Sequence, residues 1–141
     1  MPDNTINRFK KAQEHSYHRA KKELLEGEKQ SHWMWYMFPQ LKGLGYSSDA
    51  EYYGIKDIAE AREFLADTVL KNRLLELCKI LLSLPEDNPV DILGHIDALK
   101  LRSSMTLFEA AEPTCSIFHD VLNKFYGGEP DKQTLQLLSG E

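Results

Sequence analysis

The stretch DALKLRSSMTLFEAAE, from Asp97 to Glu112, decides the fold that we predict from the sequence. Asp97 is of a residue type that caps helices, and Pro113 would end one, so a single helix is expected over residues 97–112. A helix that is apolar on several faces packs between other elements, so this one is predicted to be central. The apolar residues that would lie on its several faces are Leu99, Leu101, Met105, Leu107 and Phe108.

Apolar spacing and capping residues predict further helices on both sides of this one. Ser48 to Glu51 and Asp57 to Glu60 have the form of capping boxes. β-Branched residues are few, and no alternating run lies between hairpin turns. The sequence therefore predicts an all-α fold, a single compact domain over residues 1–141 with about seven helices of mixed length. A short turn is expected from Pro89 to Gly94. The other expected helices run from a cap at Asn4 or Thr5 to about Gly27, from Ser48 to Gly54, from Asp57, from Thr68 to Pro85, from Thr114 or Ser116 to Gly127, and from Asp131.

Composition limits the classes of function. With 141 residues, 42% of them hydrophobic, the chain is large enough to bury a core of its own. A net charge of −5 argues against a dedicated nucleic-acid binder, although the stretch from Arg8 to Lys29 is locally basic. Cys78 and Cys115 lack metal-type neighbours and are expected to be buried free thiols. No apolar run approaches membrane-spanning length and no secretory segment follows Met1, so we expect a cytoplasmic protein without a membrane partner.

A second distinctive stretch, GEKQSHWMWYMFPQLKGLG, runs from Gly27 to Gly45 and holds both tryptophans of the chain. Its residues 32–38 are too short and too continuously apolar for periodicity to separate a buried helical turn from a buried strand. Pro39 ends either element. Gly43 and Gly45 permit a tight loop and a close approach of the backbone to another segment.

Cations and hydroxyls repeat along the predicted central helix, where burial would be costly for unpaired polar groups. One interpretation is structural: the hydroxyls bond to carbonyls one turn back, and the cations reach the surface or pair with carboxylates. The other is a site for an anion or a phosphate, which cations and hydroxyl donors suit. The residues concerned are Lys100, Arg102, Ser103, Ser104 and Thr106.

The aromatic stretch supplies the remaining candidates. His32 is either a general acid or base or a hydrogen-bonded structural residue. Trp33 and Trp35 are either core residues or a face on which a planar base or nicotinamide-type ring stacks. Gln13 and Gln40 are amides next to apolar runs, and such amides orient ligands inside pockets. The sequence has no known catalytic or metal-binding motif, so it predicts no metal site, names no cofactor and leaves open whether the protein is an enzyme.

Five blocks of the sequence closely resemble the family known as domain of unknown function 1810, over nearly the whole chain. The resemblance implies a small, mainly α-helical, bacterial-type protein, of a family without an established activity. Where the family often has a GSPDD step, Gly94 to Asp97 keeps the glycine and the aspartate but lacks proline. The blocks are RF-x-x-AQ (Arg8 to Gln13), HWMWYMFPQLKGLG (His32 to Gly45), EA (Glu60 and Ala61), LKLRSSMTLF (Leu99 to Phe108) and YGG-x-x-D-x-x-TL (Tyr126 to Leu135).

Members of this family are sometimes labelled calpastatin-like, but calpastatin's inhibitory segments are flexible chains, whereas core stripes run throughout this sequence. A remoter similarity, in arrangement and not in motifs, is to the NADAR group of NAD- and ADP-ribose-associated proteins. That similarity implies that Lys100, Arg102 and the neighbouring hydroxyls face a phosphate, and that Trp33 or Trp35 faces a base.

Two hypotheses for function follow. In the first, the protein binds a small anionic or nucleotide-like ligand between residues 32–45 and the helix 97–112, with ADP-ribose or NAD-related hydrolysis as the candidate reaction. This hypothesis requires the two stretches to touch. In the second, the protein is a protein–protein interaction or antitoxin-like module without catalytic activity. The second requires an exposed aromatic patch formed by Trp33, Trp35, Tyr36 and Phe38.

Overall fold

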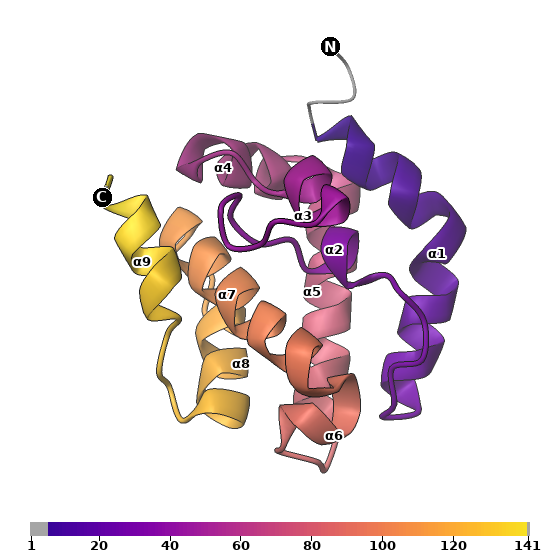
Figure 1. The fold of residues 1–141 in the computed structure, drawn as a ribbon. Coiled ribbons are helices and arrows are strands. Elements are labelled where there is room, and N and C mark those ends of the chain that lie inside the picture. Colours follow the sequence, from indigo (N-terminus) through magenta and orange to yellow (C-terminus); the bar gives the residue numbers. More distant parts are fainter. Residues whose placement is uncertain (1–5, 141) are drawn as a thin grey trace.

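The computed structural model describes residues 6–140, which form an all-α domain of short and long helices joined by loops (Figure 1). This confirms the predicted fold class. The described residues contain nine helices, more than predicted, because several are only one or two turns long. They are α1 (Asn7–Leu25), α2 (Met34–Met37), α3 (Ser48–Tyr53), α4 (Ile58–Ala66), α5 (Thr68–Ser83), α6 (Pro89–Leu93), α7 (His95–Ala111), α8 (Ile117–Tyr126) and α9 (Lys132–Leu138).

The helix starts follow from capping side chains. Asp57 accepts a hydrogen bond from the backbone N–H of Glu60, and Asp131 accepts one from Thr134, so both predicted caps are confirmed. At α3 the cap is Ser47 and not Ser48, since the Ser47 hydroxyl oxygen accepts a hydrogen bond from the backbone N–H of Ala50. The proposed caps Asn4 and Thr5 of α1 lie outside the described residues.

The start of α7 differs from the prediction. The helix begins at His95, with Gly94 in the N-cap position at φ 87°, a conformation that suits glycine. Asp97 therefore does not cap α7, and the prediction of its cap was wrong. Its carboxylate lies in the first turn, where the helix dipole stabilises a negative charge. It forms ion pairs there with Lys29 and Lys100.

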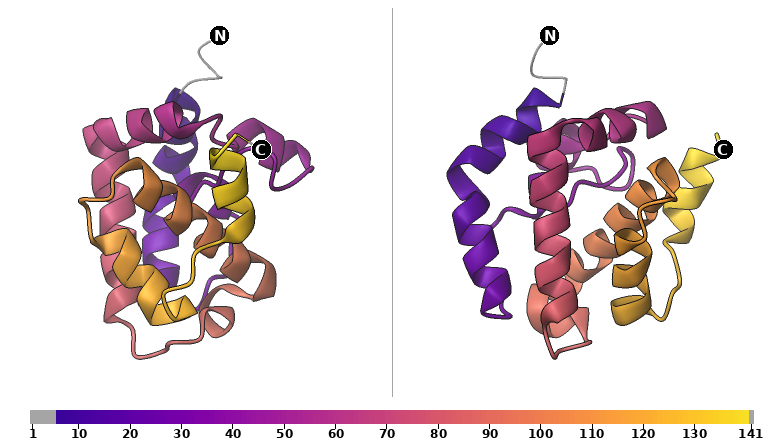
Figure 2. Two further views of the ribbon diagram at one scale, coloured as in Figure 1. Left: turned by 90° about the vertical axis from the view of Figure 1, so that its left-hand side faces the viewer. Right: turned by 180° about the vertical axis from the view of Figure 1, so that it is seen from behind.

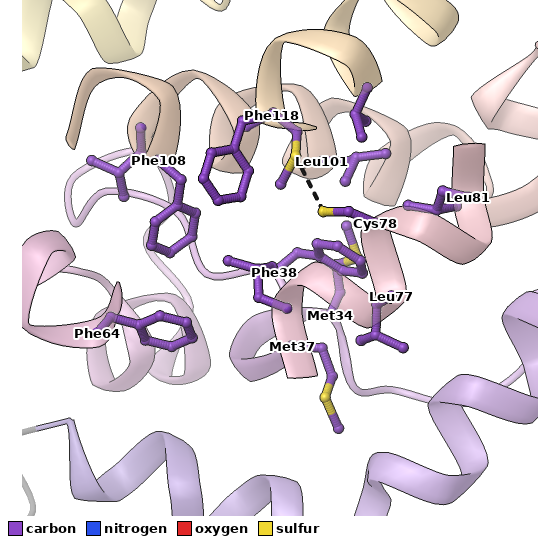
Figure 3. Packing of buried hydrophobic residues seen from close by; sticks show 14 of the residues in the cluster. Met34, Met37, Phe38, Phe64, Leu77, Cys78, Leu81, Leu101, Phe108 and Phe118 are labelled. Atoms are coloured by element: carbon purple, nitrogen blue, oxygen red, sulfur yellow. Dashed lines mark hydrogen bonds between the residues drawn. The ribbon is translucent and has the colours of Figure 1, made fainter. Parts of the chain in front are cut away.

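The predicted central position of α7 is confirmed. It packs against α4, α6, α8 and α9, and its residues Leu101, Met105, Leu107 and Phe108 are completely buried. Figure 3 shows side chains from α2, α4, α5, α7 and α8 meeting in one core. Leu99, however, is 54% exposed. One face of the amino-terminal half of α7 is therefore open to solvent.

The helices α1 and α5 lie side by side on the other side of the core (Figures 1 and 2). Both cysteines are free thiols, as predicted; Cys78 of α5 is buried and Cys115 is half-buried. The Cys78 sulfur lies 3.8 Å from the sulfur of Met105, and burial raises the pKa of the Cys78 thiol. No helix within residues 6–140 has both the length and the apolar character needed to cross a membrane.

Residues 26–47 cross the front of the helices in Figure 1 and contain α2, so the helical alternative for the aromatic run is observed. An isolated parallel bridge between Leu41 and Ile55 fixes the segment after α2, and Ile55 N–H donates to the Gln40 carbonyl at 2.9 Å. Gly43 has φ 104°, as a tight loop requires. A Cβ atom at Gly54 would lie 2.8 Å from backbone atoms of Lys42 and Ala50, so only glycine fits there.

Candidate functional site

A cavity of about 460 Å³ lies between the chain around α2 and the amino-terminal end of α7. One wall comes from the segment before and within α2, and the other from the turn that leads into α7. The two stretches that the first hypothesis pairs therefore contact each other. The cavity is lined by Lys29, His32, Met34, Trp35, Leu93, Gly94, His95, Ile96, Asp97 and Lys100.

Two lysines converge on one carboxylate in this cavity. The Lys29 ammonium lies 2.8 Å from Asp97 Oδ2, and the Lys100 ammonium lies 3.3 Å from Asp97 Oδ1. Lys29 is set in place by its backbone N–H, which donates to the Ile92 carbonyl at 2.7 Å. Two cations thus face one anion at the amino end of a long helix, so this end of the cavity keeps a positive excess.

Lys100 also lies over the indole of Trp35, with its ammonium 3.4 Å from the ring centroid. At this distance the cation is attracted by the negative face of the ring. Trp35 is half-buried, and both residues line the cavity. The contact holds a lysine at a fixed place on the cavity wall instead of leaving it free in solvent.

The loop that carries Lys29 and His32 is organised by a buried carboxylate. Glu23 Oε1 accepts from the backbone N–H of Gln30 (2.8 Å) and of Ser31 (3.0 Å) and from the Trp33 indole N–H (2.8 Å). Burial raises the pKa of Glu23, but these hydrogen bonds together with one from the Ser31 hydroxyl outweigh it and hold the pKa at about 2.

Trp33 is consequently a core residue that is 1% exposed, with its only polar atom bonded to Glu23. It does not line the cavity. Of the two tryptophans predicted to face a ligand, only Trp35 is placed to do so.

A second cavity, of about 410 Å³, lies on the other side of Trp35 and Lys100. Its lining includes Gln40 and Ser103, two of the predicted ligand-binding residues. The Ser103 hydroxyl donates to the Leu99 carbonyl at 3.2 Å, one turn back, as the structural interpretation expects. Its oxygen still has capacity to accept a hydrogen bond.

The predicted residues Gln13 and Arg102 lie outside both cavities. The buried Gln13 amide donates to the Tyr36 carbonyl at 2.8 Å and so holds α2 against α1. Arg102 donates to the Glu129 carbonyl at 2.9 Å and lies over the ring of Tyr126. Their observed contacts are structural ones.

Thr106 is likewise outside both cavities. Its hydroxyl donates to the Arg102 carbonyl at 2.8 Å and accepts from the Asp131 backbone N–H at 2.9 Å. It therefore joins α7 to the start of α9. Ser104 is completely buried, lines neither cavity, and its hydroxyl has no hydrogen-bond partner among residues 6–140.

Replacing Ser104 by alanine is therefore expected to raise the free energy of unfolding by about 1 kcal/mol, because it removes a buried hydroxyl without a partner. Urea unfolding of the two proteins measures the change. Ser103→Ala is the matched control and should change stability by less than about 0.5 kcal/mol, since its hydroxyl bonds within its own helix. A loss of stability in Ser104→Ala would show that the hydroxyl has a partner.

His32 is exposed on the rim of the first cavity, and in the part of the chain that the structure describes no hydrogen bond orients its ring. A second exposed histidine, His95, lines the same cavity. Sequence reasoning missed His95 and Lys29 as site residues. A signal was present for both, because one follows Gly94 in the turn before the central helix and the other precedes the aromatic run.

The aromatic patch that the second hypothesis requires is not contiguous. Trp33 and Phe38 are each 1% exposed, while Trp35 and Tyr36 are half-buried. Among residues 6–140, no group of three or more His, Cys, Asp or Glu side chains is arranged to hold a metal ion.

These features define a small all-α protein with two adjoining cavities along its central helix. The chain belongs to the DUF1810 family: the family model described as "Protein of unknown function (DUF1810)" matches residues 3–138. The fold is similar to the crystal structure of the conserved hypothetical protein Rv1873 from Mycobacterium tuberculosis, with a TM-score of 0.94, 40% sequence identity and 99% of each chain covered. None of the curated proteins compared with the chain matches it. The resemblance found in the sequence is thereby confirmed.

Proposed function

We propose that this protein binds a small anionic, nucleotide-like ligand in the first cavity, between residues 29–35 and the amino end of α7. The observation that carries the proposal is the convergence of the Lys29 and Lys100 ammonium groups on the single carboxylate of Asp97 at the cavity wall. Each lysine can donate three hydrogen bonds. Lys29 donates to Asp97 and to the Ser31 carbonyl and Lys100 donates to Asp97, so each ammonium keeps at least one donor. An entering anion can be contacted by both.

The amino end of α7 supports the same proposal. Within residues 6–140, the backbone N–H groups of His95, Ile96 and Asp97 have no hydrogen-bond partner, and no side chain caps the helix. Unpaired donors at the first turn of a helix, together with the helix dipole, favour an anionic ligand. These residues line the cavity that holds the two lysines.

The size and the aromatic wall suit a nucleotide more than an inorganic ion alone. A cavity of about 460 Å³ lies within the range of roughly 300–1,000 Å³ that is usual for small-molecule sites. Trp35 adds an aromatic surface beside the cations. We also place the protein in the bacterial cytoplasm, where nucleotides are abundant and the thiols of Cys78 and Cys115 stay reduced.

The finer hypothesis of ADP-ribose or NAD-related hydrolysis needs a group that activates water. His32 is the candidate general base, because it lies on the rim of this cavity and imidazole titrates near neutrality. A catalytic histidine is normally oriented by a hydrogen bond to its second nitrogen, and no described residue provides one. The observations therefore favour binding over catalysis.

Replacing Lys100 by alanine is expected to weaken binding of the ligand at least about tenfold, because one of two cations and its contact with Trp35 are lost. A thermal-shift screen with pyrophosphate, nucleoside phosphates, NAD and ADP-ribose identifies ligands, since a ligand that binds only the folded protein raises Tm. Calorimetry then gives Kd for the wild type and the variant. His32→Ala, assayed for product formation, tests the hydrolytic step.

Lys22→Ala is the matched control, because Lys22 is an exposed lysine of α1 that lines neither cavity. It should leave Kd within about twofold of the wild-type value. The proposal is wrong if no anionic compound of the screen raises Tm, or if Lys22→Ala weakens binding as much as Lys100→Ala.

A further inference from the structure

The two cavities adjoin each other along α7 and share a wall. Trp35, Ile96 and Lys100 line both of them. Because the Lys100 ammonium is held over the Trp35 ring, these two side chains lie together between the two cavities. A ligand that is longer than an inorganic anion and contacts Lys100 in the first cavity can continue into the second.

The open face of α7 forms one side of the second cavity, and its first residues also line the first cavity. Ile96, Leu99, Lys100 and Ser103 follow one another at spacings of three and four residues, which places them on one side of a helix. Ile96 is 67% exposed and Leu99 is also largely exposed, whereas the apolar residues farther along the helix, such as Leu101 and Met105, are completely buried. An uncharged group of the ligand would cover this apolar surface.

The polar groups of the second cavity differ from those of the first. Apart from Lys100 its lining contains no cation, but it contains the amides of Gln40 and Gln133. In the described part of the chain the half-buried Gln40 amide has no hydrogen-bond partner, although its backbone is fixed by Ile55. A primary amide offers a donor and an acceptor side by side, which complements the edge of a planar heterocycle.

We propose that the ligand of this protein is a nucleoside phosphate that spans both cavities, with its phosphates in the first and its base in the second. The base lies against Leu99 and Leu44, and the Gln40 amide bonds to its edge. Lys100 lies between the two parts and contacts the phosphates. This inference rests on the proposed function, since it takes the anion-binding role of the first cavity as given and adds the second.

The test compares a ligand with both parts and a ligand with the anionic part alone. Calorimetry is carried out with inorganic pyrophosphate and with a panel of nucleoside 5′-diphosphates that carry each of the common bases. At least one nucleoside diphosphate is expected to bind about tenfold or more tightly than pyrophosphate, because burial of the base against the leucines and its hydrogen bond to Gln40 add to the affinity. The variant is Gln40→Ala/Leu99→Ala, which changes only the second cavity.

In this variant the nucleoside diphosphate should no longer bind more tightly than pyrophosphate. Kd for pyrophosphate should stay within about twofold of the wild-type value. Leu135→Ala, which removes an exposed leucine of α9 outside both cavities, should keep the gain. Equal affinity of the wild type for pyrophosphate and for every nucleoside diphosphate would overturn this inference and leave the proposed function standing. A gain that the double variant retains would also overturn it. Absence of binding to pyrophosphate and to all nucleoside diphosphates would overturn both.

Discussion

Replacing Glu23 by alanine is expected to lower the free energy of unfolding by about 3–4 kcal/mol, because four donors lose their buried acceptor. The Trp33 indole N–H, inside the core, would be left without a partner. Urea unfolding with tryptophan fluorescence measures the loss. Since the same carboxylate shapes the loop that carries Lys29, binding of an anionic ligand should weaken as well.

Glu23→Gln is the matched variant, since it keeps the shape and one acceptor oxygen but cannot be ionised. We expect it to lose only about 1–2 kcal/mol, the difference between charged and neutral acceptors. A loss in Glu23→Ala no larger than in Glu23→Gln would contradict the proposed role of the buried hydrogen bonds.

The free energy of unfolding of the wild type, compared with that of Glu23→Gln, is also expected to depend on pH. The pKa of Glu23 is lowered from 4.5 in the unfolded chain to about 2 in the folded protein. The stability that ionisation of the carboxylate contributes is therefore complete above about pH 4.5 and is lost as the pH falls through about 2. The difference in stability between wild type and Glu23→Gln should shrink over this range. A difference that stays constant would contradict the assigned pKa.

Most of the fold was predictable because local sequence patterns determine where the helices begin and end. The apolar stripe of α5 and the stops at Pro85 and Pro113 fix that helix and the end of α7 to within two residues. The start of α7 was not predictable in the same way, because two residue types compete there. Asp97 has a good capping side chain, but its carboxylate is taken by Lys29, a residue distant in sequence, and Gly94 takes the N-cap position instead.

The candidate site was predictable only in part, for a similar reason. The repeat of cations and hydroxyls along the helix marked Lys100 and Ser103 as candidates, but it could not say which hydroxyls would face a cavity. Thr106 and Ser104 lie away from both cavities. The role of Glu23 was hidden, because a glutamate among lysines on a helix looks like a surface residue. Its four partners become visible only when the loop folds back on α1.

Two of the sequence blocks that carry the family resemblance have a structural explanation outside both cavities. Arg8 and Glu60, from the RF-x-x-AQ and EA blocks, form a buried ion pair between α1 and α4, with Arg8 Nη1 3.0 Å from Glu60 Oε2. The guanidinium also donates to the carbonyls of Tyr52 (2.8 Å) and Gly54 (2.9 Å). The pair thus ties the chain before α4 to α1.

Replacing Glu60 by alanine is expected to lower the free energy of unfolding by about 3–5 kcal/mol, because it removes the carboxylate that forms two hydrogen bonds and a buried ion pair with Arg8. The backbone N–H of Lys56 loses its acceptor as well. The double variant Arg8→Met/Glu60→Leu should lose less than the sum of the two single changes by about 2 kcal/mol or more, since it removes both charges together. Urea unfolding of the four proteins in this cycle gives the coupling energy.

Arg62→Ala is the control, because Arg62 is an exposed arginine of α4 whose one hydrogen bond within residues 6–140 is to the Ala111 carbonyl at 3.3 Å. This change should cost less than about 1 kcal/mol. Additive losses in the cycle would show that the two charges do not stabilise each other.

The Arg8–Glu60 pair lies outside both cavities, but Arg8 bonds to the Gly54 carbonyl, next to the Ile55 backbone that fixes Gln40. If the second cavity binds a base, Glu60→Ala should therefore weaken the binding of a nucleoside diphosphate more than that of pyrophosphate, even under conditions where the variant is fully folded.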